Sequence, residues 1–125
     1  MKKFVLILFL AMMMIFSNQQ AHARDIYIGT SNATGWDCYV MTETINITRR
    51  DDNGYLKNFD VTLKMITSSR KVLYLDYSFE RHENASHDIT WYFVNSQGFQ
   101  GKVDVRNTPI EYNLWEYVLD NYRNQ

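Results

Sequence analysis

Hydrophobic and polar residues alternate along most of this chain, the pattern of a β-strand with one buried face. The alternation is strictest over residues 57–67, where Phe59 and Val61 lie on the apolar face and Asp60 on the polar face. The clearest turn is 51–54, because its Asn-Gly pair supplies the positive φ that a tight hairpin needs. The predicted strands are 25–29, 36–41, 44–50, 57–67, 71–80, 89–95 and 99–105, and the second and third of these are alternatively one strand bent near Glu43.

The last segment has a helical period instead. Thr108 is a good N-cap, Pro109 suits the first helical position, and Glu111 completes a capping box by reaching back to the cap nitrogen. The sequence therefore predicts a helix over 109–122 that buries one apolar stripe. That stripe is Ile110, Leu114, Tyr117, Val118 and Tyr122.

Consecutive strands joined by short turns and followed by one helix indicate an α+β fold. We predict a curved antiparallel sheet of about six strands, arranged as a meander and packed by the C-terminal helix. One sheet face carries the larger apolar side chains and should lie against the helix. Its members are Phe59, Val61, Leu63, Leu73, Leu75, Tyr77, Trp91 and Phe93.

The N-terminal segment 1–23 has the features of a cleaved secretory signal peptide. Lys2 and Lys3 precede an apolar run of 13 residues, 4–16, and an Ala-His-Ala sequence ends the segment. The run is shorter than the roughly 20 residues that a membrane-spanning helix needs. We therefore predict cleavage before Arg24, a single exported domain over 24–125 without a membrane span, and a periplasmic or secreted location.

Charge gives no indication of nucleic-acid binding. Without the two leader lysines, residues 24–125 carry 11 Lys and Arg against 14 Asp and Glu. Nucleic-acid-binding domains are typically basic, with Lys and Arg clustered on one face. We therefore expect no nucleic acid among the partners.

Cys38 is the single cysteine of the chain. An exported disulfide scaffold would contain an even number of cysteines. The favoured interpretation is a buried, inert thiol. Pairing between two chains in a homodimer and a nucleophilic role beside His82 or His87 are the alternatives.

The segment 81–88 contains His82, Glu83, His87 and Asp88, which are side chains that can bind a divalent metal. The histidines are one residue further apart than in the helical zinc motif, and the segment lies between strands. We therefore predict a solvated loop, with no metal and no cofactor. No catalytic arrangement stands out, so we predict that the protein is not an enzyme.

The second sheet face is the predicted binding surface. It carries apolar side chains at positions that a sheet covered on one side would leave polar. Scattered surface apolar residues, or a sheet that curls and buries both sides, are the alternatives. The face includes Val40, and the predicted binding residues are Val72, Tyr74, Tyr92 and Val94.

Several landmarks resemble the surface-adhesin protein E-like family, and more closely uncharacterised small exported proteins of Negativicutes bacteria. The resemblance implies a curved antiparallel sheet backed by a C-terminal helix and a surface or periplasmic binding role. The landmarks are the segments 36–40 and 59–64, Thr44-Ile45, Tyr77 with Phe79, Trp91-Tyr92, Gly98, Gly101 and the helix start at 108–111.

From these patterns we expect an exported, non-enzymatic binding or interaction module of the envelope or cell surface. Its partner would be a protein or a small molecule of unknown identity. A structural envelope-associated protein without a discrete ligand is the alternative. A small hydrolase or a metal-binding protein is a less favoured one.

Overall fold

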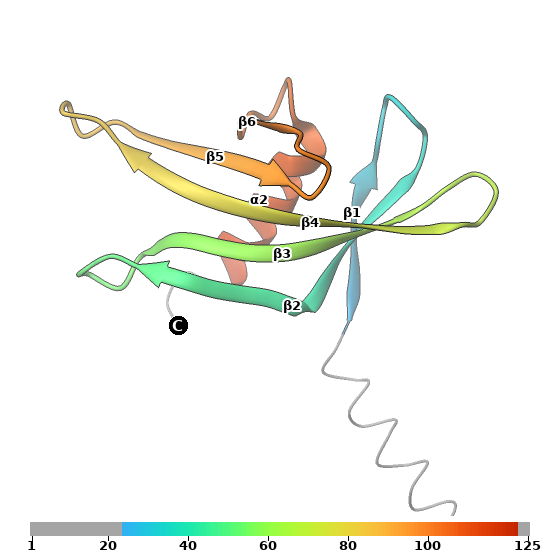
Figure 1. Ribbon diagram of the computed structural model, residues 1–125, viewed down its shortest axis with the longest axis horizontal. Helices are drawn as coiled ribbons and strands as arrows, with labels where there is room; N and C mark the ends of the chain where they lie inside the picture. The colour runs from blue at the N-terminus through green and yellow to red at the C-terminus, as the bar shows by residue number, and fades with distance from the viewer. Residues whose placement is uncertain (1–23, 123–125) are drawn as a thin grey trace, which may run out of the picture.

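A computed structural model describes residues 24–122, so the predicted signal peptide lies outside the described residues. Within them, six strands form one antiparallel sheet in the order β1 to β6, and helix α2 covers one face (Figure 1). The predicted α+β meander with a C-terminal helix is confirmed. The elements are β1 (Asp25–Thr30), β2 (Asp37–Arg50), β3 (Leu56–Ile66), β4 (Val72–Glu83), β5 (Ile89–Asn95), β6 (Gln100–Lys102) and α2 (Pro109–Tyr122).

Two strands, β4 and β6, end more than one residue away from the predicted positions. Strand β4 continues to Glu83, so only 84–88 remains as the loop before β5. Its alternation weakens beyond Glu80, where polar side chains occupy consecutive positions, and the pairing of 81–83 with β5 extends the strand nevertheless. Strand β6 covers only three residues, fewer than the predicted 99–105.

Strand β2 is one continuous strand with an irregular middle, as the bent-strand alternative predicts. Its pairing with β3 shifts between Met41 and Asn46. The hydroxyl of Thr44 fills this gap by donating to the Met41 carbonyl (2.6 Å) and accepting from the Thr62 amide (2.8 Å). An irregularity of this kind increases the local bend of a strand. The β1 end of the sheet therefore turns away from the direction of β4 and β5 (Figure 1).

The core lies between α2 and the sheet face that it covers, the inner face. Leu114 and Val118 from α2 are fully buried, and the rings of Phe59 and Phe79 stack at 4.8 Å between their centroids. Burying apolar area of this kind stabilises the fold by about 25 cal/mol per Å². The core residues are Cys38, Val40, Leu56, Phe59, Val61, Leu63, Leu75, Tyr77, Phe79, Trp91, Phe93, Leu114 and Val118.

The face predicted for Val40 is wrong, and Leu73, which lies on the predicted face, is exposed instead of buried. Val40 has no exposed surface, because it pairs with Leu63 and so points to the inner face, not to the second face. Leu73 lies on the same face of β4 as Leu75, but it is 41% exposed because it lies at the end of the sheet where β4 begins. Alternation predicts which residues share a face, whereas register and the reach of the helix decide which of them are buried.

The start of α2 also differs from the predicted capping box. The Thr108 amide donates to the Asp104 carbonyl (2.9 Å) instead of to Glu111. The Thr108 hydroxyl accepts from the Asp104 amide (2.8 Å) and so closes the loop 104–108. Glu111 is thereby free to point towards the sheet, where Tyr77 Oη donates to its Oε2 (2.6 Å).

Helix α2 covers the edge strand β1. Asn113 Nδ2 donates to the Ile28 carbonyl (2.8 Å), which satisfies a backbone group that an edge strand would otherwise expose. Gly29, with φ of 138°, lets the two elements approach, because a Cβ there would lie 3.4 Å from Asn113 Nδ2. This contact brings the loop after β1 to the N-terminal end of the helix.

Candidate functional site

A cleft of about 490 Å³ opens at the N-terminal end of α2, and we call it the helix-end cleft. Its floor is the inner face of the sheet, and loops form its walls. Apolar side chains cover its floor, and about half of the lining residues carry polar side chains. The lining residues are Ser31, Asn32, Ala33, Thr34, Cys38, Leu63, Met65, Leu75, Tyr77, Asn95, Gln97, Phe99, Arg106, Asn107, Pro109, Ile110 and Glu111.

Local hydrogen bonds hold the walls in place. On one side, the Gly35 amide donates to the Ser31 carbonyl (2.7 Å), and this closes the loop after β1. On another side, Asn95 Oδ1 accepts from the amides of Gln97 (3.0 Å) and Phe99 (3.1 Å), and this shapes the turn between β5 and β6. Asparagine side chains stabilise turns in this way.

The loop 104–108 forms the third wall. The backbone amides of Arg106 (2.8 Å) and Asn107 (3.3 Å) donate to Asp104 Oδ1. These bonds hold the pKa of the Asp104 carboxyl below its ordinary value. The side chains of Arg106 and Asn107 line the mouth of the cleft.

A chain of two hydrogen bonds links Asn95, Tyr77 and Glu111 in the cleft. Tyr77 Oη donates to Glu111 Oε2 (2.6 Å), and Asn95 Nδ2 donates to Tyr77 Oη (3.4 Å). Burial raises the pKa of Tyr77, and the hydrogen bond to Glu111 raises it further. Tyr77 is therefore a neutral donor at physiological pH, and it fixes the position of the Glu111 carboxylate.

Cys38 lies in the same region and is almost completely buried. Its thiol donates to the Trp36 carbonyl at 3.6 Å. Burial raises its pKa from 9.0 to about 11. The thiol is thus protonated at neutral pH, as expected for a buried, inert cysteine and not for a nucleophile.

The four predicted binding residues are exposed on the sheet face opposite α2, the outer face, but they form two groups. Val72 and Tyr74 lie on β4 beside Ile66 and Lys64, whereas Tyr92 pairs with Glu80. Tyr74 and Glu80 are six positions apart on one strand, which corresponds to about 20 Å. The exposed fractions are 42% for Val72, 57% for Tyr74, 43% for Tyr92 and 41% for Val94.

Polar pairs separate these two groups. Thr62 Oγ1 donates to Asp76 (2.7 Å), and Ser78 Oγ donates to Asp60 (2.7 Å) across strands β3 and β4. The Tyr92 group borders a groove of about 320 Å³, and Val72 and Tyr74 lie outside it. The groove is lined by Thr48, Asn58, Asp60, Ser78, Phe79, Glu80, Tyr92, Phe93, Val94 and Gln100.

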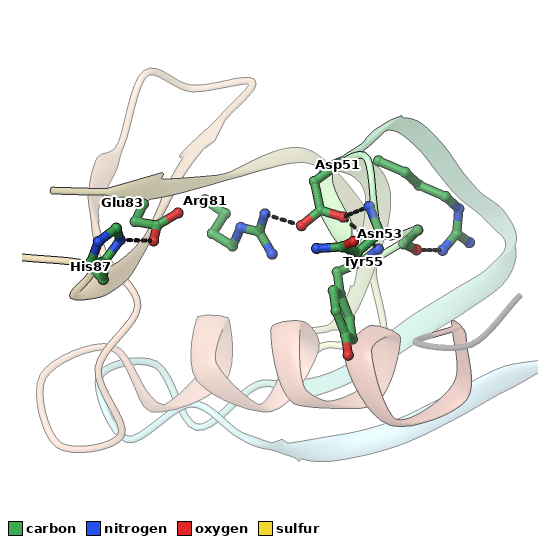
Figure 2. Close-up of polar contacts among 8 residues, drawn as sticks. Asp51, Asn53, Tyr55, Arg81, Glu83 and His87 are labelled. Atoms are coloured by element: carbon green, nitrogen blue, oxygen red, sulfur yellow. Dashed lines mark hydrogen bonds and ion pairs between the residues drawn. The ribbon is translucent and has the colours of Figure 1, made fainter. Parts of the chain in front are cut away.

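The candidate metal-binding side chains of 81–88 pair separately. Figure 2 shows His87 Nδ1 beside Glu83 Oε1 (3.0 Å), while Arg81 reaches away to Asp51 (2.8 Å). His82 lies on the outer face, 3.4 Å from Glu80. Within residues 24–122, no group of three or more His, Cys, Asp or Glu side chains is placed to hold a metal ion.

The ion pair between Arg81 and Asp51 links the turn between β2 and β3 to strand β4. Asp51 also accepts from the amides of Asn53 and Tyr55 (both 2.9 Å), so its carboxylate organises the turn (Figure 2). The hydrogen bond from Arg81 is the main cause that lowers the pKa of Asp51. The charged side chains of Asp51 and Arg81 therefore have a structural role, because they hold the turn between β2 and β3 in place.

Comparison with known proteins finds no matching protein family, no matching curated protein and no matching solved structure. In the part of the chain from 24 to 122, no helix combines the length and the apolar character needed to cross a membrane.

The sequence prediction does not include Asn95 or Glu111 among the binding residues. Asn95 has a local signal, since the segment from Asn95 to Gly98 is a recognisable turn. Glu111 also has a local signal, but that signal predicts a capping box and not a binding residue. Their convergence on Tyr77 depends on contacts between residues that are far apart in the sequence.

Proposed function

We propose that this chain is an exported, non-enzymatic binding module of the bacterial envelope or cell surface, and that the helix-end cleft is its binding site. The observation that carries the proposal is the combination of an apolar floor with three polar side chains that hydrogen bonds hold in place, Asn95, Tyr77 and Glu111. Small-molecule sites have this composition and typically enclose 300–1,000 Å³. The cleft volume of about 490 Å³ lies within that range.

The protonation of Tyr77 and Cys38 supports binding over catalysis. Burial keeps Tyr77 and Cys38 protonated, so neither offers a base or a nucleophile at neutral pH. Glu111 is engaged by Tyr77 and has no histidine beside it among the groups that line the cleft. These side chains are suited to orienting a ligand.

Export is proposed from the sequence of the first 23 residues. A basic start, an apolar run and the Ala-His-Ala ending are the parts of a secretory signal. The resemblance to surface-adhesin protein E-like proteins supports the same location. A binding role at the outer face is a second candidate, favoured by the groove beside Tyr92.

Blocking the cleft tests the proposal. Ala33 is exposed on the loop after β1 and lines the cleft, so Ala33→Trp would place a large ring at its mouth. The matched control is Ala85→Trp, on the exposed loop between β4 and β5. The probe is N-phenylnaphthylamine, a neutral apolar dye that fluoresces more strongly when it leaves water.

We expect one dye molecule to bind per wild-type chain and per Ala85→Trp chain, and we expect Ala33→Trp to lose this binding. Thermal melts of both variants establish that the chains are folded. Equal dye binding by Ala33→Trp would place the dye elsewhere and would remove the helix-end cleft as the site.

A further inference from the structure

We propose that the helix-end cleft selects ligands that carry an organic cation, such as a primary ammonium group, and that Glu111 binds this cation. This inference rests on the proposed function, since it names the ligand class for the same cleft. The ligand would place an apolar body on the floor of the cleft and its ammonium group at the carboxylate.

The position of Glu111 supports this assignment. One carboxylate oxygen, Oε2, accepts the hydrogen bond from Tyr77, and the other, Oε1, accepts none from residues 24–122. A carboxylate accepts several hydrogen bonds, so Oε1 can still receive an N–H donor. Ammonium–carboxylate hydrogen bonds are about twice as strong as those between neutral groups.

Glu111 is also held before a ligand arrives. Asn95 is fixed by the turn between β5 and β6, its amide donates to Tyr77, and Tyr77 donates to Glu111. A fixed anionic acceptor loses little conformational freedom on binding, and this favours affinity.

The other charged residue in the lining is Arg106. It is exposed on the loop 104–108, where water and salt screen its charge, whereas Glu111 is half-buried. The apolar floor beside Glu111 lowers the local dielectric and strengthens its attraction for a cation. Leu63, Leu75 and Phe99 supply apolar lining for the body of the ligand.

The test compares two small probes that differ in charge, phenylethylamine and phenylpropionate. Shifts of backbone amide NMR signals give the affinity of each probe and the residues that it affects. We expect phenylethylamine to shift amides around the cleft and to bind more tightly than phenylpropionate. In Glu111→Gln, its affinity should fall about tenfold or more, because one charged hydrogen bond is lost.

Glu111→Gln keeps the side-chain shape and an oxygen for Tyr77, so the fold should survive, as a thermal melt will show. Glu116→Gln is the matched control, since it removes a carboxylate from an exposed position of the same helix. We expect that control to bind phenylethylamine as the wild type does.

Three results would overturn the inference. Equal loss of affinity in Glu116→Gln would show a general charge effect, and unchanged affinity in Glu111→Gln would remove Glu111 from binding. Tighter binding of phenylpropionate, lost in Arg106→Gln, would show that the cleft selects anions. In each case the neutral dye can still bind the cleft, so failure of the ligand class is distinguishable from failure of the proposed function.

Discussion

At the scale of single residues, burial keeps two titratable side chains of the inner face neutral. Burial raises the pKa of the Cys38 thiol from 9.0 to about 11, and it also raises the pKa of Tyr77. Between about pH 9 and 11, the unfolded chain loses the thiol proton while the folded chain keeps it. The folded state then binds more protons, so stability is complete below this range and falls as the pH rises through it.

Cys38→Ala tests this pH dependence. The free energy of unfolding should fall by roughly 2–3 kcal/mol more in the wild type than in the variant between about pH 8 and pH 11. Urea denaturation at the two pH values measures this difference. Tyr77 is present in both proteins, so its own contribution cancels, and parallel stability curves would contradict the proposed burial of the thiol.

At the scale of secondary-structure elements, short-range patterns predict most of the fold. Strict alternation predicts β3 and the first part of β4, and the helical period predicts α2 with its correct bounds. The position of Val40 is not predicted, because a strand pattern lacks the register that turns Val40 towards Leu63. The capping box fails for a similar reason, since Tyr77 competes for Glu111 from a distant strand.

Leu114 and Leu73 are both predicted to face the core, but only one of them is buried. Leu114 of α2 is completely buried, whereas Leu73 of β4 is 41% exposed although its strand position indicates the inner face. Leu114→Ala should therefore lower the free energy of unfolding by about 2–5 kcal/mol. Leu73→Ala should lower it by less than about 1 kcal/mol.

Urea denaturation of the two alanine variants measures both changes in the same way. Each substitution removes the same atoms, so the difference between the variants reports the packing of the site and not the chemistry of the side chain. Similar losses of stability would mean that α2 does not cover the sheet as described.

At the scale of the whole molecule, the helix-end cleft arises from segments that are distant in the sequence. The loop 31–34, the turn after β5 and the loop 104–108 meet there only because β1 and β6 are opposite edges of one bent sheet and α2 reaches β1. Local patterns predict each strand and the helix, but not this meeting point. The sequence therefore directs attention to the outer face, and the cleft is found only in three dimensions.

The outer face provides a last prediction, because its predicted binding residues lie in two groups. Tyr74 and Tyr92 are both exposed and are about 20 Å apart along the sheet. Tyr74→Ser and Tyr92→Ser should each keep the fold and lower the free energy of unfolding by about 1 kcal/mol or less. In the double variant, the two effects should add to within about 0.5 kcal/mol, as for independent sites.

A double-mutant cycle by urea denaturation measures this coupling without any partner. Additive losses would support two separate surfaces, so that a partner of one group need not touch the other. Coupling above about 1 kcal/mol is typical of residues in contact and would mean that the outer face acts as one cluster. That result would restore the single binding surface predicted from the sequence, and it would contradict the separation by the pairs of Thr62 with Asp76 and Ser78 with Asp60.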